Sequence, residues 1–201
     1  MRARAVFIFS VLLVTVIASL STACGAEVPR VIRDEMTKTS QVNAGAATVV
    51  FFTDFQCPFC RKTHAALAPI VAARHDRVRV VIRHVPLPRH PDARTAARAA
   101  VCVERIANAM TNDYVHALFE SPDLSEAACE ELAVERGVDP DKLRRCLADP
   151  ATDARIEEDI AMFDAVQGDG VPLLYVGRAR LDGAQSRERL EAAIDDAIAR
   201  K

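Results

Sequence analysis

Cys57-Pro58-Phe59-Cys60 decides how this chain folds, because it places two thiols two residues apart shortly after a strongly hydrophobic run. That run, residues 49–53, is rich in β-branched and aromatic side chains and predicts a buried strand. Pro58 suits the first position of a helix, where no N–H is needed. Cys57 then lies at a helix N-terminus, where unpaired amides and the helix dipole stabilise a thiolate. The pattern predicts that Cys57 takes part in disulfide exchange and that Cys60 resolves the mixed disulfide.

A lone C-x-x-C motif is also common in metal-binding proteins, so half of a zinc site is the main alternative. A structural zinc ion needs four ligands, and His64 adds only a third local candidate to Cys57 and Cys60. We therefore expect neither a metal nor another cofactor, and we interpret His64 as a solvated helix residue. A metal-binding or metallochaperone lipoprotein that uses these three residues stays as an alternative. Four histidines lack a metal-ligand spacing: His64, His84, His90 and His116.

The N-terminus has the composition of a secretory signal. Two arginines precede a mainly apolar stretch at residues 6–20, which is followed by small residues. A membrane-spanning helix needs about 20 apolar residues, more than this stretch offers, so residues 1–23 are predicted to be a cleaved signal peptide. Residues 21–24, Ser-Thr-Ala-Cys, also resemble a bacterial lipoprotein cleavage site. We therefore expect Cys24 to carry a lipid, with ordinary signal cleavage as the alternative.

Composition and charge limit the classes of function. The chain has 201 residues and a net charge of −2, which becomes −4 without residues 1–23, because they hold two arginines and no acid. This balance does not favour a nucleic-acid partner. The remaining length fits one domain, and six cysteines in an exported chain favour redox or structural pairing. Residues 24–45 are predicted to be a tether with one short helix near residues 31–36, which is too short to dimerise, so we expect a monomer.

The order of predicted elements indicates an α/β fold. Helical spacing follows the cysteine motif, and residues 78–82 predict a second strand. From 91 to 167 the pattern is helical, with Asp149-Pro150 as one cap and first-turn proline. Two short strands around Gly177 and a final helix follow. A helical block inserted between strands predicts a mixed sheet flanked by helices, with a helical subdomain over one side.

Gly170-Val171-Pro172 stands directly before the predicted hairpin. A proline in this place could simply begin an edge strand. Considered together with the cysteine motif, Pro172 matches the cis proline that lies against the cysteine pair in thioredoxin-like sites. Val171 matches the preceding residue, whose backbone pairs with an extended substrate. We therefore expect a cis Val171–Pro172 bond and assign these two residues to substrate binding.

Four segments carry a family resemblance. They are residues 51–60, Arg83-His84-Val85-Pro86-Leu87 with His90, Gly170-Val171-Pro172, and Gly183-Ala184-Gln185. Over roughly residues 46–198 the chain resembles the DsbA-type thiol:disulfide oxidoreductases. One position departs from the pattern, because many thioredoxin-fold enzymes carry a buried acid six residues before the first cysteine, where this chain has Phe51. Asp54 is the nearest acid, and we interpret it as a loop or cap residue.

The resemblance implies a thioredoxin fold at residues 46–201 with a helical insertion at about 91–167, and an extracytoplasmic location. It also implies disulfide transfer to reduced secreted proteins and recycling by a quinone-linked membrane partner of the DsbB or vitamin K epoxide reductase type. Pro58-Phe59 resembles the oxidase and isomerase versions more than the Gly-Pro of thioredoxin. We therefore predict an exported oxidant in the periplasm or at the cell surface. A disulfide reductase or isomerase for a dedicated client is the alternative.

Three further cysteines, Cys102, Cys129 and Cys146, lie in the predicted helical block. Three cysteines allow three single pairs, so the sequence itself leaves the pairing open, and all three could be buried free thiols. Cysteines recur in similar proteins at the positions of Cys102 and Cys146. The resemblance therefore implies a structural Cys102–Cys146 bridge, which leaves Cys129 free.

Overall fold

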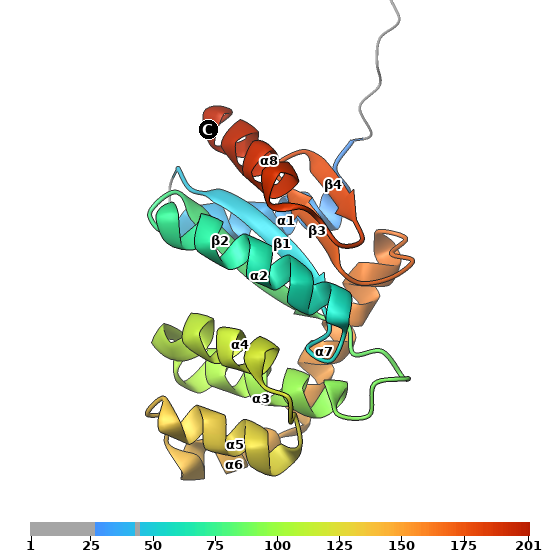
Figure 1. Ribbon diagram of the computed structural model, residues 1–201. Helices are drawn as coiled ribbons and strands as arrows, with labels where there is room; N and C mark the ends of the chain where they lie inside the picture. Colours follow the sequence, from blue (N-terminus) through green and yellow to red (C-terminus); the bar gives the residue numbers. More distant parts are fainter. Residues whose placement is uncertain (1–26, 43–44) are drawn as a thin grey trace, which may run out of the picture.

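A computed structural model describes residues 27–42 and 45–201 (Figure 1). The predicted signal peptide and the predicted lipidation site Cys24 lie outside these residues. No helix within them is long and apolar enough to span a lipid bilayer. The elements in chain order are α1 (Arg30–Val42), β1 (Ala47–Thr53), α2 (Pro58–Ala73), β2 (Val78–His84), α3 (Ala93–Ile106), the 3-10 helix η1 (Asn108–Met110), α4 (Thr111–Glu120), α5 (Glu126–Glu135), α6 (Pro140–Leu147), α7 (Pro150–Ala165), β3 (Leu173–Val176), β4 (Ala179–Asp182) and α8 (Arg187–Ala199).

The described residues form a four-stranded sheet in the order β2-β1-β3-β4. β1 lies parallel to β2, with Phe51 opposite Ile82, because helix α2 carries the chain back between the two strands. β3 runs antiparallel to both β1 and β4. The tight turn between β3 and β4 uses Gly177 in the left-handed conformation, with a φ of 56°. The predicted mixed sheet is confirmed, and the fully buried β1 is one of its two central strands.

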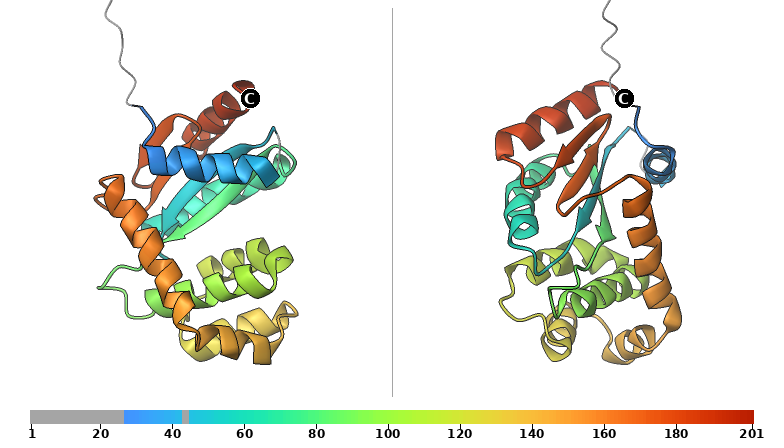
Figure 2. Two further views of the ribbon diagram at one scale, coloured as in Figure 1. Left: turned by 180° about the vertical axis from the view of Figure 1, so that it is seen from behind. Right: turned by 90° about the vertical axis from the view of Figure 1, so that its right-hand side faces the viewer.

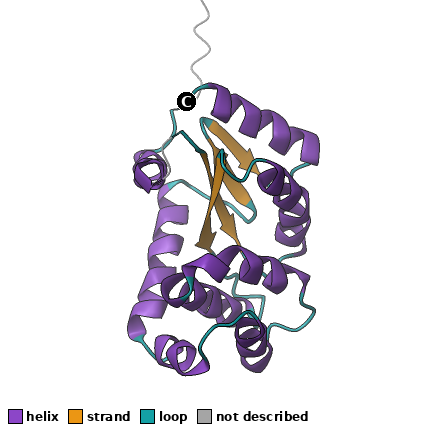
Figure 3. Ribbon diagram, turned by 90° about the vertical axis from the view of Figure 1, so that its left-hand side faces the viewer, coloured by secondary structure: helices purple, strands orange, loops and turns teal. Residues whose placement is uncertain are grey.

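Helices cover both faces of the sheet (Figure 2). α2 and α8 lie on one face, while α1 and part of α7 lie on the other. Helices α3 to α6 form a separate group beside the sheet layer (Figure 3). α7 belongs to both parts, because it starts next to α6 and places the ring of Phe163 5.6 Å from that of Phe52 in β1. The expected helical subdomain is therefore present, and its last helix completes the second layer on the sheet.

Helix α1 is longer and more tightly packed than the sequence suggests. Within the tether predicted at residues 24–45, the structure has a helix that runs from Arg30 to Val42, longer than the short helix predicted near residues 31–36. Ile32 is fully buried in the core, and Glu35, on the same face of the helix, pairs with Arg83 of β2. The prediction of a tether is wrong for this helix. The helix packs on β1, which begins at Ala47, and pairs with β2 through Glu35, so its stability comes from these tertiary contacts.

A buried ion-pair network joins α1, β2 and α7. Arg83 pairs with Glu35 and with Asp159, whose Oδ1 lies 2.9 Å from Arg83 Nη1. Asp159 Oδ2 accepts a hydrogen bond of 2.8 Å from the backbone N–H of His84, and Arg155 forms a further ion pair with the same carboxylate. The Asp159 side chain is fully buried, so these donors offset the free energy needed to remove its charge from water.

Asp159→Ala is expected to lower the free energy of unfolding by about 3–5 kcal/mol, because it leaves the buried Arg83 guanidinium and the His84 N–H short of a partner. Urea unfolding followed by circular dichroism measures the change. Asp164→Ala removes an exposed acid from the same helix and is the matched control, with an expected change below about 0.5 kcal/mol. Equal losses from the two substitutions would contradict the role given to the network.

Cys102 of α3 and Cys146 of α6 form a disulfide, with their Cα atoms 5.7 Å apart. This is the pair that the resemblance implies. Cys129 is a buried free thiol, and its Sγ donates to the Leu124 carbonyl at 3.4 Å. Tyr114 donates a hydrogen bond of 2.8 Å to the Cys129 carbonyl, which joins α4 to α5. The bridge and this hydrogen bond hold together different helix pairs of the subdomain.

Removal of the bridge by Cys102→Ala with Cys146→Ala is expected to lower the free energy of unfolding by about 2–4 kcal/mol, because the bond closes a loop across a separation of 44 residues in the unfolded chain. Guanidinium unfolding without reductant measures this loss. The alkylation rate of Cys57 should stay the same in the folded variant. An unchanged unfolding free energy would show that no bridge forms in the folded protein.

Candidate active site

Cys57 is the N-cap residue of α2, and Pro58 is the first residue of the helix. Cys57 has φ −72° and ψ 120°, so it belongs to the extended segment that enters the helix. Its backbone N–H donates to the Asp54 carbonyl at 3.1 Å, and its carbonyl accepts from the Arg61 N–H at 3.0 Å. The loop after β1 and the first turn of α2 therefore both fix Cys57. This is the strand, cysteine and helix arrangement that the sequence predicts.

The surroundings of Cys57 favour its thiolate. The Cys60 thiol donates a hydrogen bond to the Cys57 sulfur, and the backbone N–H groups of Cys60 and Phe59 add two more donors. Burial and the negative charge of Asp54 act in the opposite direction. The donors outweigh them and lower the pKa of Cys57 from an ordinary value of 9.0 to about 6. At neutral pH, most Cys57 is therefore ionised.

Cys60 is in the opposite electrostatic situation. It is fully buried, and burial raises the pKa of its thiol far above the ordinary range. The neighbouring Cys57 raises the pKa further, while the nearby Thr53 hydroxyl lowers it by less. The proton therefore stays on Cys60 and the negative charge on Cys57. The Cys57 sulfur is therefore suited to attack a disulfide and to leave as a thiolate. The Cys60 sulfur holds the proton.

The Val171–Pro172 segment lies against the cysteine pair. Its peptide bond is cis, and the Val171 carbonyl oxygen lies 3.7 Å from Cys57 Sγ, to which the thiol form of Cys57 can donate. The Pro172 carbonyl accepts a hydrogen bond of 2.9 Å from the Gly183 N–H. This hydrogen bond links the segment to the end of the β3–β4 hairpin. Residues separated by 114 positions in the sequence are thus brought together at one site.

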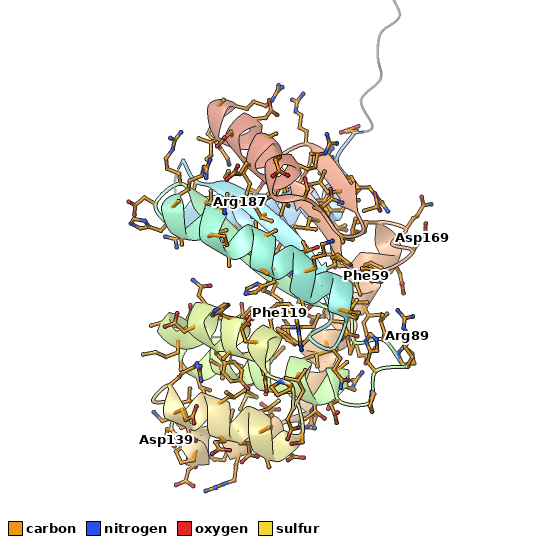
Figure 4. The ribbon with its side chains drawn as sticks, in the orientation of Figure 1. Phe59, Arg89, Phe119, Asp139, Asp169 and Arg187 are labelled. Atoms are coloured by element: carbon orange, nitrogen blue, oxygen red, sulfur yellow. A yellow bond between two sulfur atoms is a disulfide. The ribbon has the colours of Figure 1, made fainter. Side chains whose placement is uncertain are left out.

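Phe59 is the exposed side chain of the motif. It is 61% exposed, while Cys57 beside it is buried. Figure 4 places Phe59 at the start of α2, between the loops that carry Arg89 and Asp169. Exposed aromatic rings of this size provide contact area for apolar side chains of a partner. The site therefore combines a shielded sulfur with an accessible apolar surface.

An apolar residue and a buried acid flank the motif on its N-terminal side. Phe51, six residues before Cys57, is fully buried in the core. Asp54 is 2% exposed, and its carboxylate accepts hydrogen bonds from the N–H of Gln56 at 2.7 Å, the N–H of Leu87 at 2.8 Å and His90 Nδ1 at 2.7 Å. Asp54 is a loop residue, in agreement with the sequence interpretation. Its pairing with His90 is a feature that the sequence reasoning missed, although both residues belong to segments that carry the resemblance.

A sequence model of the thioredoxin family matches residues 42–196, which include the sheet, the cysteine motif and the helical subdomain. The chain belongs to the thioredoxin family. Among curated proteins it is similar to the Na(+)/H(+) antiporter NhaA 3 of Salinispora tropica, with 33% identity over 154 residues. The match covers 76% of this chain and 23% of the antiporter, so the chain spans about a quarter of the length of the curated relatives it matches.

Three solved structures share the fold of this thioredoxin-family chain. A thioredoxin-like oxidoreductase from Silicibacter pomeroyi is 29% identical, with a TM-score of 0.67 over 77% of this chain and 88% of that one. A periplasmic thioredoxin-like protein from Salmonella enterica is 24% identical, with a TM-score of 0.67 over 76% and 84%. The thiol-disulfide exchange protein α-DsbA2 of Wolbachia pipientis is 18% identical, with a TM-score of 0.69 over 83% and 95%. The fold is that of the DsbA-like thiol-disulfide oxidoreductases.

His64 is not solvated in this thioredoxin-family protein, so that interpretation is wrong. The residue is buried, its ring stacks on Phe119 at 4.4 Å, and its Nε2 lies 3.2 Å from His116 Nδ1 of α4. Figure 4 places Phe119 between α4 and α2. The residues around His64 do not reveal this burial, because the covering helix lies about 50 residues further along the chain. Within the described residues, no three His, Cys, Asp or Glu side chains are arranged to hold a metal ion.

Acid is expected to destabilise the protein through His64. Burial, and then the proximity of His116, lower the pKa of His64 to about 4, whereas an unfolded chain has an ordinary value of 6.5. Between these two values the unfolded state binds a proton that the folded state does not, so stability falls as the pH falls from about 6.5 to 4, by about 3 kcal/mol for this residue. Burial lowers the pKa of His84 to about 4 as well, so part of the acid sensitivity is independent of His64.

Urea unfolding at several pH values between 4 and 7 measures this dependence. His64→Gln should reduce the slope of the free energy of unfolding against pH. His75→Gln removes an exposed histidine and is the matched control, for which the slope should stay unchanged. A His64→Gln variant with the slope of the unsubstituted protein would contradict the burial of a neutral His64.

Proposed function

We propose that this protein is an exported thiol:disulfide oxidoreductase that acts as an oxidant, passing its Cys57–Cys60 disulfide to cysteines of secreted proteins. The observation that carries the proposal is the stabilised thiolate of Cys57 at the start of α2. A stable thiolate is a good leaving group, and its stability favours the reduced form of the pair. The oxidised pair is then a strong acceptor of electrons from substrate thiols.

The exchange proceeds in two steps. A substrate thiolate attacks Cys57 Sγ, the Cys57–Cys60 bond breaks, and Cys60 leaves with the electron pair and takes up a proton. A second substrate thiolate then attacks the substrate sulfur of the mixed disulfide and releases the Cys57 thiolate. Two substrate thiols are oxidised to one disulfide, and the active-site disulfide is reduced to a thiolate and a thiol.

Substrate contacts follow from the surface around Cys57. The Val171 backbone lies next to Cys57 and is placed to pair with an extended segment of an unfolded client. Phe59 offers an exposed ring beside the reacting sulfur for an apolar side chain next to the client cysteine. Backbone pairing with one apolar contact suits many different sequences, which fits a general donor of disulfides to reduced secreted proteins.

Export and recycling complete the proposal. The apolar N-terminal segment supports a cleaved signal at residues 1–23, and Cys24 supports a lipid anchor at a periplasmic or cell-surface membrane. After each turnover the reduced pair needs an oxidant, and a quinone-linked membrane protein of the DsbB or vitamin K epoxide reductase type supplies one. The protein acts as a monomer.

Cys57→Ser is expected to abolish disulfide exchange, because the attacked sulfur is lost. Cys60→Ser should instead accumulate mixed disulfides with disulfide-bonded client proteins, because its Cys57 thiolate attacks a client disulfide, expels one client thiolate, and no longer has the internal thiol that releases the adduct. Non-reducing gels and mass spectrometry of the adducts measure both effects. Cys129→Ser removes a buried free thiol outside the site, and it should retain exchange. Unchanged exchange in Cys57→Ser would contradict the proposal.

The reduction potential decides the direction of electron flow. An oxidant should have a potential well above the thioredoxin value of about −270 mV, as measured by equilibration with glutathione. A value at or below that of thioredoxin would identify the protein as a reductase instead. Stoichiometric binding of zinc or copper by the reduced protein, without exchange activity, would identify a metal-binding protein.

A further inference from the structure

Two loops meet beside Cys57 through a pair of contacts. The first loop, residues 54–56, joins β1 to Cys57, and the second, residues 85–92, joins β2 to α3. The Asp54 carboxylate in the first loop accepts hydrogen bonds from the Leu87 N–H and from His90 Nδ1 in the second loop. Gln56 and Asp92 exchange two hydrogen bonds, of 3.0 Å and 2.7 Å. The second loop therefore sets the position of the segment that ends at Cys57.

The Asp54 carboxylate is the buried charge of this junction. Its side chain is fully buried, while that of His90 is 17% exposed. Oδ1 accepts from the Gln56 N–H, and Oδ2 accepts from both the Leu87 N–H and His90 Nδ1. A carboxylate is an acceptor at both oxygens, so Nδ1 of His90 carries the proton in this contact. A buried carboxylate needs such donors, because removal of its charge from water is unfavourable.

We propose that Asp54 and His90 are positioning residues that together set how readily Cys57 exists as a thiolate, and hence how strongly the cysteine pair oxidises its clients. Asp54 holds Cys57 in place, since its carbonyl accepts from the Cys57 N–H at 3.1 Å, and it also places a negative charge close to the Cys57 sulfur. His90 donates to that charge and weakens its effect on Cys57. The inference rests on the proposed function, in which Cys57 is the attacked sulfur.

The charge of Asp54 and the donor of His90 act on Cys57 in opposite directions. The negative charge of Asp54 raises the pKa of Cys57, against the donors at the start of α2. Loss of that charge stabilises the thiolate further, whereas loss of the His90 donor exposes Cys57 to the uncompensated charge. The segments around this junction carry further charged or titratable groups: Arg89 and Asp92 in the second loop, Arg83 and His84 at the end of β2, and Cys60, Arg61, Lys62 and His64 in α2. In the structure, His90 is the side chain that donates to Asp54 Oδ2.

Substitutions of Asp54 and His90 should move the properties of Cys57 in opposite directions. Asp54→Asn keeps an acceptor oxygen for the loop and removes the charge. It should lower the pKa of Cys57 by on the order of one unit and shift the equilibrium with glutathione about tenfold toward the reduced protein. His90→Phe should raise the pKa of Cys57 and shift that equilibrium the other way. His90→Asn, whose amide can donate in place of Nδ1, should restore part of the effect.

The pH dependence of thiolate absorbance and the rate of alkylation measure the pKa of Cys57 directly. In an Asp54→Asn background, His90→Phe should leave that pKa unchanged, because His90 acts through the charge of Asp54. Asp92→Asn is the matched control, since it alters an acid between the same two loops that does not contact Asp54 or Cys57. It should leave the pKa of Cys57 unchanged.

Two results would overturn the inference. One is an Asp54→Asn variant that loses stability while the pKa of Cys57 stays the same or rises, which is the result of a purely structural role. The other is a His90→Phe effect of equal size with and without the Asp54 charge. If Asp54→Asn does not fold, the comparison of His90→Phe with His90→Asn decides the question. Failure of the proposed function is distinct, because the unsubstituted protein would then lack exchange activity or an acidic Cys57.

Discussion

The separation of charge between two neighbouring sulfurs is the constraint on which the rest of the site depends. A thiolate is stable at Cys57 because α2 begins there and because the Cys60 thiol donates to it. Cys60 keeps its proton because it is fully buried. The first condition requires the helix to start at Pro58, because a start one turn later would remove the backbone donors of Phe59 and Cys60 from Cys57.

The order of the strands explains how three distant segments reach this helix start. β1 ends at Thr53 and leads into the cysteine motif, and its parallel neighbour β2 ends opposite it at His84. β3 is antiparallel to β1, so its first residues lie at the same end of the sheet, where the cis Val171–Pro172 bond precedes it. The loop after β2 and the segment before β3 therefore flank Cys57 from two sides. The ion pairs of Arg83 secure the same strand end from the opposite face of the sheet.

Features that depend on local chemistry could be predicted from the sequence, whereas features that depend on distant partners could not. Pro58 as the start of a helix and Gly177 as a turn follow from the conformations these residues favour. The placement of Val171 near Cys57 needed the family resemblance in addition, because no local signal links segments 114 residues apart. The burial of His64 and the pairing of Asp54 with His90 depend on the paths of α4 and of the loop after β2.

The acid of this site lies next to Cys57 and not at the position of Phe51, and this placement bears on the direction of exchange. In a mixed disulfide at Cys57, return attack needs a Cys60 thiolate, which burial disfavours. Phe51 is buried and apolar, so the side chain at that position cannot accept the Cys60 proton. A second thiol of the client is then favoured to complete the exchange, and the client leaves with a new disulfide. In the proposed function, an apolar residue at the position of Phe51 therefore favours disulfide donation over disulfide reduction.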